Sequence, residues 1–164
     1  MAVFDKPHRL KSFDYSSVCS YMLTFNVKDR AQALSEIIDH GYLNPVEVRL
    51  KPWGRITERY IRNIESVYHG VILENYVIMP DHVHLLLTLD DYVPAVRKDK
   101  PRISQIIRAT KAMISREIGR SIWQLDFYDV VADTEEIFRR CDDYIDNNPI
   151  EWLRNNRTEP KDPK

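Results

Sequence analysis

The stretch that decides the fold is residues 70–89, which read GVILENYVIMPDHVHLLLTL. Two apolar, β-favouring runs, 70–79 and 82–89, are separated by Pro80-Asp81, a pair typical of turns. So short a connection forces the two strands to be antiparallel, because a parallel pair needs a long crossover. The most apolar part of the chain therefore predicts an antiparallel pair of strands.

The flanking sequence predicts further strands and helices around this pair. Strands are expected at 19–27, which reads CSYMLTFNV, at 46–50, and at 127–131. Helical spacing of apolar residues predicts helices at 29–40, 54–69, 102–119 and 134–148. The last helix is expected to end at Asn148, because Pro149 disfavours helical geometry in the residue before it. Residues 91–100 are charged and are expected to form a loop, and the whole pattern predicts an α+β fold with a mainly antiparallel sheet.

Length and composition indicate one globular domain. The chain has 164 residues, of which 43% are hydrophobic and 30% charged. We expect a polar arm at 1–18, a single domain at 19–153 and a polar tail at 154–164. No signal peptide or membrane-spanning run is evident, and the two cysteines, Cys19 and Cys141, suit a reducing compartment. A cytoplasmic location with no membrane partner is therefore expected.

Charge is unevenly distributed along the chain. The formal net charge is −1, but residues 97–120 carry eight Lys or Arg against two acidic residues. A local basic helix of this kind can contact phosphates even when the whole protein is neutral. A solvated helix face is the alternative explanation of the same pattern.

Two histidines indicate half of a metal site. His82 and His84 are two residues apart on a predicted strand, so both imidazoles project from one face, while Val83 and Leu85 point into the core. Neutral imidazole is the commonest nitrogen ligand of divalent metals. Taken alone, the pair also fits two hydrogen-bonded histidines without a metal.

The segment DDYIDNNP, residues 142–149, contains a second pair of candidates. Tyr144 and Asn148 are four residues apart on a predicted helix and share one face. A tyrosine hydroxyl is a candidate nucleophile, and an amide oxygen is a candidate third ligand for a hard cation. The alternative is that Tyr144 packs against the sheet and Asn148 caps the helix.

Taken in order, these segments resemble the single-tyrosine HUH transposases, including the REP-associated tyrosine transposases. The matching stretches are VIMPDHVHLLL (77–87), the Trp-Gln and Phe-Tyr-Asp residues of WQLDFYD (123–129), and YIDNNP (144–149). The resemblance covers about residues 21–152. It implies a ferredoxin- or RRM-like fold with the helices packed on one face of the sheet.

The resemblance also implies a function and a set of site residues. His82, His84 and Asn148 would hold Mg²⁺ or Mn²⁺, and Tyr144 would attack single-stranded, hairpin-forming DNA to give a covalent 5′-phosphotyrosine. Relatives often carry Gln where this chain has the shorter Asn148, and Leu125 and Asp126 replace basic or small residues. Arg108, Lys111 and Arg116 are the expected phosphate contacts. A homodimer is favoured slightly over a monomer.

Two other functions fit the same sequence. A non-catalytic, RRM-like nucleic-acid-binding module would bind without metal and without the Tyr144 hydroxyl. A metal-dependent phosphoesterase would use water as the nucleophile, with Tyr144 only packing. Only the transposase hypothesis predicts a covalent bond between protein and DNA.

Overall fold

The centre of the molecule is a four-stranded antiparallel sheet. The structure, a computed structural model, describes residues 19–41, 45–90 and 102–156. The sheet has the strand order β4-β5-β1-β6, formed by β1 (Cys19–Asn26), β4 (Val71–Ile78), β5 (His82–Leu89) and β6 (Tyr128–Ala132). The predicted antiparallel pair is confirmed as β4 and β5, which are joined by the turn at Pro80-Asp81. The predicted α+β class is therefore confirmed.

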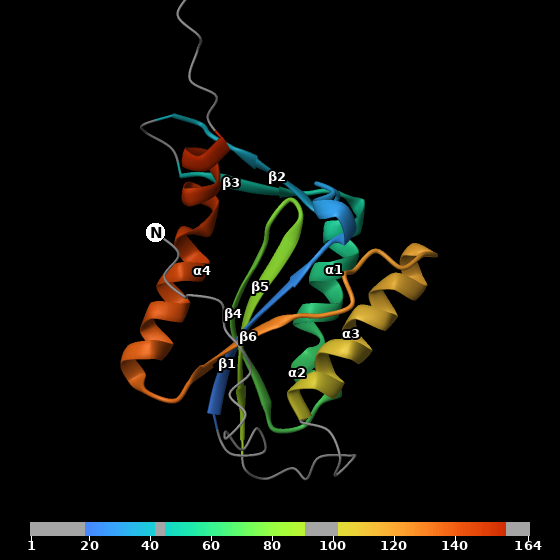
Figure 1. Cartoon of the computed structure of the whole chain (residues 1–164), viewed down its shortest axis with the longest axis vertical. Helices are drawn as coiled ribbons and strands as arrows, with labels where there is room; N and C mark the ends of the chain where they lie inside the picture. Colours follow the sequence, from blue (N-terminus) through green and yellow to red (C-terminus); the bar gives the residue numbers. More distant parts are fainter. Residues whose placement is uncertain (1–18, 42–44, 91–101, 157–164) are drawn as a thin grey trace, which may run out of the picture.

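Helices cover both faces of this sheet, which corrects the expectation that they lie on one face (Figure 1). Helices α1 (Pro52–Arg62), α2 (Ile64–Val67) and α3 (Arg102–Ile118) pack with the side chains of Leu23, Val83 and Leu85. Helix α4 (Glu135–Asn156) packs with Met22 and Leu86 on the other face, hereafter the α4 face. Because neighbouring strand residues point to opposite faces, each strand contributes to two separate cores.

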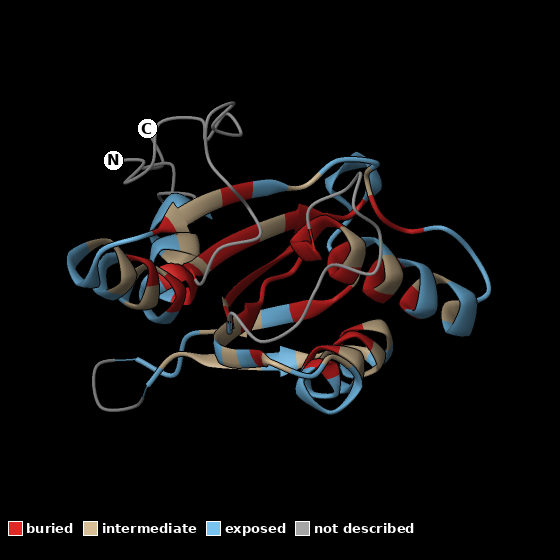
Figure 2. Ribbon diagram, turned by 90° about the horizontal axis from the view of Figure 1, so that it is seen from below, coloured by how far each residue is buried: buried red, intermediate tan, exposed pale blue. Residues whose placement is uncertain are grey.

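Buried residues gather in the strands and on the inner sides of the helices (Figure 2). The free cysteines Cys19 and Cys141 are both buried, as expected for packing residues. Among the described residues, no helix has the length and apolar character needed to cross a membrane. The predicted arm at 1–18 and the predicted loop at 91–100 lie outside the described residues.

The predicted helix at 29–40 is wrong. Its start is a short 3-10 turn, η1 (Lys28–Arg30), and its end is strand β2 (Ser35–Ile38), which pairs with β3 (Glu47–Leu50). The turn is broken by Asp29 and Arg30, whose φ angles of 55° and 53° are left-handed. The apolar spacing fits a helix, but backbone pairing with β3 and packing of Ile37 on the α4-face core favour the strand.

The predicted end of the last helix at Asn148 is also wrong. Helix α4 continues through Pro149 to Asn156, so residues 154–156 belong to the helix and not to a polar tail. An internal proline removes one backbone hydrogen bond and costs about 3 kcal/mol in an isolated helix. Here Pro149 is buried and Trp152 packs against the α4-face core, and this burial offsets the lost bond.

Candidate active site

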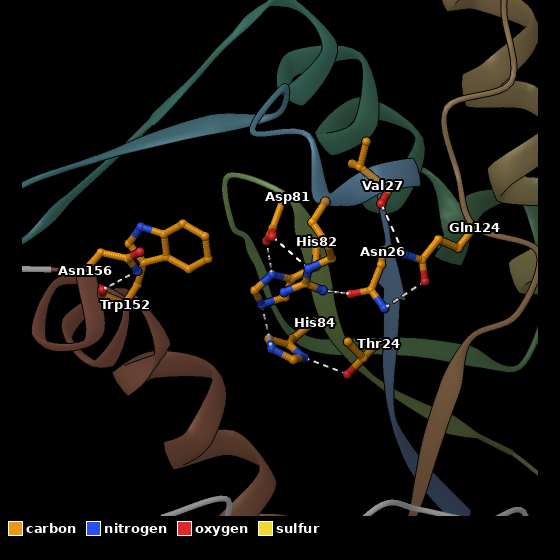
Figure 3. A network of polar contacts seen from close by, with 10 residues as sticks. Thr24, Asn26, Val27, Asp81, His82, His84, Gln124, Trp152 and Asn156 are labelled. Atoms are coloured by element: carbon orange, nitrogen blue, oxygen red, sulfur yellow. Dashed lines mark hydrogen bonds and ion pairs between the residues drawn. The ribbon is translucent and has the colours of Figure 1, made fainter.

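Strands β1 and β5 position the two histidines side by side. His84 lies opposite Thr24 and His82 lies opposite Asn26 in the antiparallel register. Val83 and Leu85, the intervening residues, belong to the core on the other face, as the alternation predicted. The two imidazoles therefore project together from the α4 face (Figure 3).

The imidazole rings converge on a single point. The Nε2 atoms of His82 and His84 lie 3.0 Å apart. The ring centroids are 4.6 Å apart, and the ring planes are inclined at 78°. Both side chains are buried, with 7% and 4% of their surface exposed. The two imidazoles therefore lie on one face of the sheet, as the two-residue spacing of His82 and His84 predicted.

The other nitrogen of each ring is held by a neighbouring polar side chain. His82 Nδ1 lies 2.6 Å from Asp81 Oδ1, and His84 Nδ1 lies 2.7 Å from Thr24 Oγ1. The carboxylate at His82 Nδ1 fixes the orientation of that ring and favours the tautomer with its lone pair on Nε2. The Thr24 hydroxyl fixes the orientation of the His84 ring and can either accept from or donate to its Nδ1 atom. These contacts give both rings the orientation that a metal ligand needs.

Electrostatics keep His84 in its neutral form. Burial, together with the charges of His82 and Arg30, holds the pKa of His84 well below its ordinary value of 6.5. A neutral imidazole retains a lone pair on one ring nitrogen, and that nitrogen can bind a cation. His84 is therefore ready to act as a ligand at physiological pH.

The residues present fit a divalent cation. Two ligands that bind at about 2.1 Å and at right angles lie about 3.0 Å apart, which is the octahedral arrangement that Mg²⁺ prefers. The observed Nε2–Nε2 separation of 3.0 Å matches this value. Within the described ranges there is no cluster of three or more His, Cys, Asp or Glu side chains around a common point. A third protein ligand there would have to be another group, such as an amide oxygen.

Helix α4 brings Tyr144 to the imidazole pair. The ring centroids of Tyr144 and His84 lie 5.1 Å apart, with the planes inclined at 76°. Ile145 and Cys141, both fully buried, anchor the helix in the α4-face core. Trp152 lies further along the helix, 6.1 Å from the His82 ring between centroids. The phenol of one chain is therefore beside the imidazoles of the same chain.

A polar contact fixes the position of this helix on the sheet. Asn75 Nδ2, on β4, donates to Asp142 Oδ1 at 2.6 Å and to Asp146 Oδ1 at 2.9 Å. The two carboxylates are one helical turn apart and lie on either side of Tyr144 in the sequence. The contact therefore restrains the rotation of α4 near its tyrosine.

Asn148 is buried on α4, one turn beyond Tyr144. The alternative role of Asn148 as a helix cap is excluded, because the helix continues for eight residues past it. No hydrogen bond joins Asn148 to either imidazole in the part of the chain that the structure describes. Its role as a third ligand stays a prediction.

Lys111 does not have the surroundings of a phosphate contact, which corrects the expectation for this residue. Its side chain is buried, and Nζ donates to the carbonyl oxygens of Gln124, Leu125 and Asp126 at 2.7, 3.0 and 3.3 Å. An ammonium group has three N–H donors, and these contacts use all three. Lys111 instead holds the loop that follows α3.

Arg108 and Arg116 are exposed on α3. That helix packs on the face of the sheet opposite the imidazoles, so the fold does not bring these two side chains to His82 and His84. They remain predicted contacts only for DNA that extends beyond the site.

The aromatic residues at 123–128 have different environments. Trp123 is buried and packs edge-on against Phe25, with centroids 4.8 Å apart, so it is a core residue. Phe127 is partly buried against the same core. Tyr128 is 49% exposed and pairs with Thr24 across the β1–β6 ladder, on the same face as the histidines.

Several residues around the imidazoles were not anticipated from the sequence. They form a chain of contacts that runs from His82 to the loop after α3 and consists of Asp81, Arg30, Asn26 and Gln124. Asp81, Asn26 and Gln124 are labelled in Figure 3. Because Asp81 directly precedes His82, its contact with that imidazole could have been anticipated from the sequence. Thr24 and Asn26 alternate with Leu23 and Phe25, but nothing local shows which strand they face.

Three comparisons with known proteins bear on the identity of the chain. Residues 15–148 match the family described as "Transposase IS200 like". An uncharacterised protein of Haemophilus influenzae (strain ATCC 51907 / DSM 11121 / KW20 / Rd) is 23% identical over 163 residues, covering 88% of this chain and 87% of that protein. A REP-associated tyrosine transposase solved bound to a REP hairpin superposes with a TM-score of 0.64 at 19% identity, covering 88% of this chain and 74% of that one.

Proposed function

Because the chain belongs to the family of IS200-like transposases, which are DNA-cleaving enzymes, we propose that it cuts and rejoins single-stranded DNA through Tyr144. The observation that supports this proposal most is the convergence of two neighbouring histidines with a tyrosine from a distant part of the sequence. The Nε2 atoms of His82 and His84 are 3.0 Å apart, and the Tyr144 ring lies 5.1 Å from His84.

The proposed first step is attack of Tyr144 Oη on a phosphodiester phosphorus. The new Oη–P bond forms as the bond from phosphorus to the 3′-oxygen breaks. The tyrosine loses its proton to solvent or a base, and the leaving 3′-oxygen takes up a proton to give a 3′-hydroxyl. The 5′-phosphate then remains on Tyr144, and attack by a 3′-hydroxyl reverses the step and joins a strand without ATP.

His82 and His84, with Asn148 as the proposed third ligand, would hold a divalent metal, Mg²⁺ or Mn²⁺. When bound, such a cation acts as a Lewis acid on the phosphate and offsets its negative charge. Asp81 and Thr24 keep the two imidazoles aligned through their Nδ1 atoms. Burial of the pair excludes water from the imidazole nitrogens, which strengthens their interaction with a cation.

We propose that the substrate is single-stranded DNA that can fold into a hairpin. The related transposase was solved bound to a REP hairpin, and Tyr144 must reach a phosphate that no complementary strand shields. A homodimer stays a prediction. Since Tyr144 lies beside His84 of its own chain, the proposed site requires no residue from a second copy.

The test is incubation with Mn²⁺ and labelled hairpin oligonucleotides, followed by denaturing electrophoresis. A 3′-end label should appear on a protein band that resists SDS, because the fragment on the 3′ side keeps the 5′-phosphate. A 5′-end label should appear only on a shortened free strand. EDTA should abolish both products.

Matched tyrosine variants identify the nucleophile. Tyr144→Phe should remove the adduct, while Tyr128→Phe, which alters a half-exposed tyrosine on the same sheet face, should leave it unchanged. DNA binding with neither cleavage nor adduct would favour a nucleic-acid-binding module. Cleavage that produces no adduct would favour a water-using phosphoesterase.

A further inference from the structure

Arg30 lies where the buried imidazole network meets solvent. Its Nε atom lies 2.8 Å from Asp81 Oδ2, and its Nη1 donates to Asn26 Oδ1. The residues that it contacts are buried, with 4% exposure for Asp81 and 7% for Asn26. The Arg30 side chain itself is 51% exposed. Two nitrogens of the guanidinium, Nε and Nη1, are therefore fixed by buried residues, while about half of the side-chain surface faces solvent.

The backbone at this position is strained. Asp29 and Arg30 both have left-handed φ angles, 55° and 53°, although neither is glycine. Consecutive residues of this kind persist only where the surrounding structure holds them, and they occur often at functional sites. Here the turn is held by the bonds from Val27 N to Asp81 O, 2.8 Å, and from Arg30 N to Val27 O, 3.2 Å. This turn brings the Arg30 side chain to Asp81, the residue that directly precedes His82.

The guanidinium has donors left for a ligand. Among the described residues, Arg30 Nη2 has no hydrogen-bond partner, and Nη1 uses one of its two N–H groups. Adjacent N–H groups on one edge of a guanidinium match two oxygens of a phosphate. The charge of Arg30 also reaches the site, since it contributes to the lowered pKa of His84.

From this geometry we infer that Arg30 binds a phosphate of the DNA strand beside His82 and His84. This inference rests on the proposed function, since it places the strand at the same site. The ion pair with Asp81 orients the guanidinium, while the remaining N–H groups of Nη1 and Nη2 donate to the phosphate. Arg30 is thus a binding residue of this site, although it lies about fifty positions before His82 in the sequence.

The binding test needs neither metal nor chemistry. Fluorescence anisotropy with labelled (dT)30 in EDTA, over a series of salt concentrations, gives the affinity and its salt dependence. Arg30→Gln should weaken binding about tenfold at low salt, which is the usual range for loss of a charged hydrogen bond. It should also reduce the slope of log K against log[salt] by about 0.7, the value for one phosphate of a single strand.

Two further variants separate phosphate binding from a merely structural role. Arg59→Gln is the matched control, because Arg59 is an exposed arginine paired with a carboxylate, Glu117, on the other face of the sheet. Arg59→Gln should change neither the affinity for (dT)30 nor the slope of log K against log[salt]. Arg30→Lys should keep the salt slope and lose part of the affinity, because lysine keeps the charge but lacks the paired N–H donors of a guanidinium. Mn²⁺ affinity, measured by calorimetry, should be no weaker in Arg30→Gln.

Protection of the unmodified protein provides a test that does not depend on folding of a variant. Phenylglyoxal modification followed by mass spectrometry should show that (dT)30 protects Arg30 and not Arg59. An unchanged salt slope in Arg30→Gln, weaker Mn²⁺ binding in that variant, or no protection of Arg30 would each overturn the inference. If the adduct with Tyr144 still forms in those cases, the proposed function stands. A wild-type protein that does not bind (dT)30 at all would overturn the inference, while adduct formation with the hairpin oligonucleotides would still decide the proposed function.

Discussion

Replacing Thr24 by valine tests whether the sheet prepares His84 to bind a metal. Valine has nearly the shape of threonine, so the change removes one hydroxyl and little volume. In the structure that hydroxyl lies 2.7 Å from His84 Nδ1, and His84 is only 4% exposed. The buried Nδ1 atom would lose its partner, and water has little access to replace it.

The expected magnitude follows from these contacts. Loss of a hydrogen-bonding partner that orients a metal ligand lowers metal affinity about 10- to 100-fold. Leaving a buried polar atom unsatisfied should also lower the free energy of unfolding by about 1–3 kcal/mol. Calorimetric titration with Mn²⁺ measures the first effect, and urea unfolding in EDTA measures the second.

Thr88→Val is the matched control. Thr88 lies on β5, four residues after His84, and its hydroxyl bonds Ser20 Oγ at 2.7 Å and Glu74 Oε1 at 2.7 Å. The same atoms are removed on the same face of the sheet, but no imidazole loses a partner. The argument fails if Thr24→Val binds Mn²⁺ within about twofold of wild type, or if Thr88→Val weakens Mn²⁺ binding equally.

Other predictions concern titration, loop stability and thiol reactivity. Because the folded state holds the pKa of His84 well below 6.5, the unfolded chain takes up this proton first, so the free energy of unfolding in EDTA should fall as the pH decreases below 6.5. In a urea titration series His84→Gln should flatten this dependence, and a wild-type curve that rises toward low pH would contradict it. Lys111→Met should lower the free energy of unfolding by about 2 kcal/mol and speed hydrogen exchange at 124–126, while the exposed Arg116→Met should do neither. Burial raises the pKa of Cys141 to about 11, so this thiol should not react with DTNB at pH 8 until the protein is unfolded. Fast reaction in the native state would show that α4 opens.

The errors of sequence interpretation have a common cause. The spacing of apolar residues at 29–40 fits a helix and a strand about equally, and pairing of β2 with β3 decides between them. Pro149 is a local signal for a helix end, but burial of Pro149 and Trp152 outweighs it. Lys111 lies in a basic segment of the sequence, which suggested an exposed side chain. In the structure the loop after α3 folds back over its amine. In each case a contact distant in sequence reverses a local preference.

Local order along the chain was enough to determine the central antiparallel pair, the α+β class, and the shared face of His82 and His84. Those features depend on the two-residue repeat of a strand and on a short turn, which are properties of neighbouring residues. Only the tertiary structure decided that α4 lies on the histidine face, that Tyr144 meets His84, and that Thr24, Asn26 and Arg30 surround the site. These contacts join residues some 50 to 60 positions apart, and their positions follow from strand order and helix packing, which no local pattern encodes.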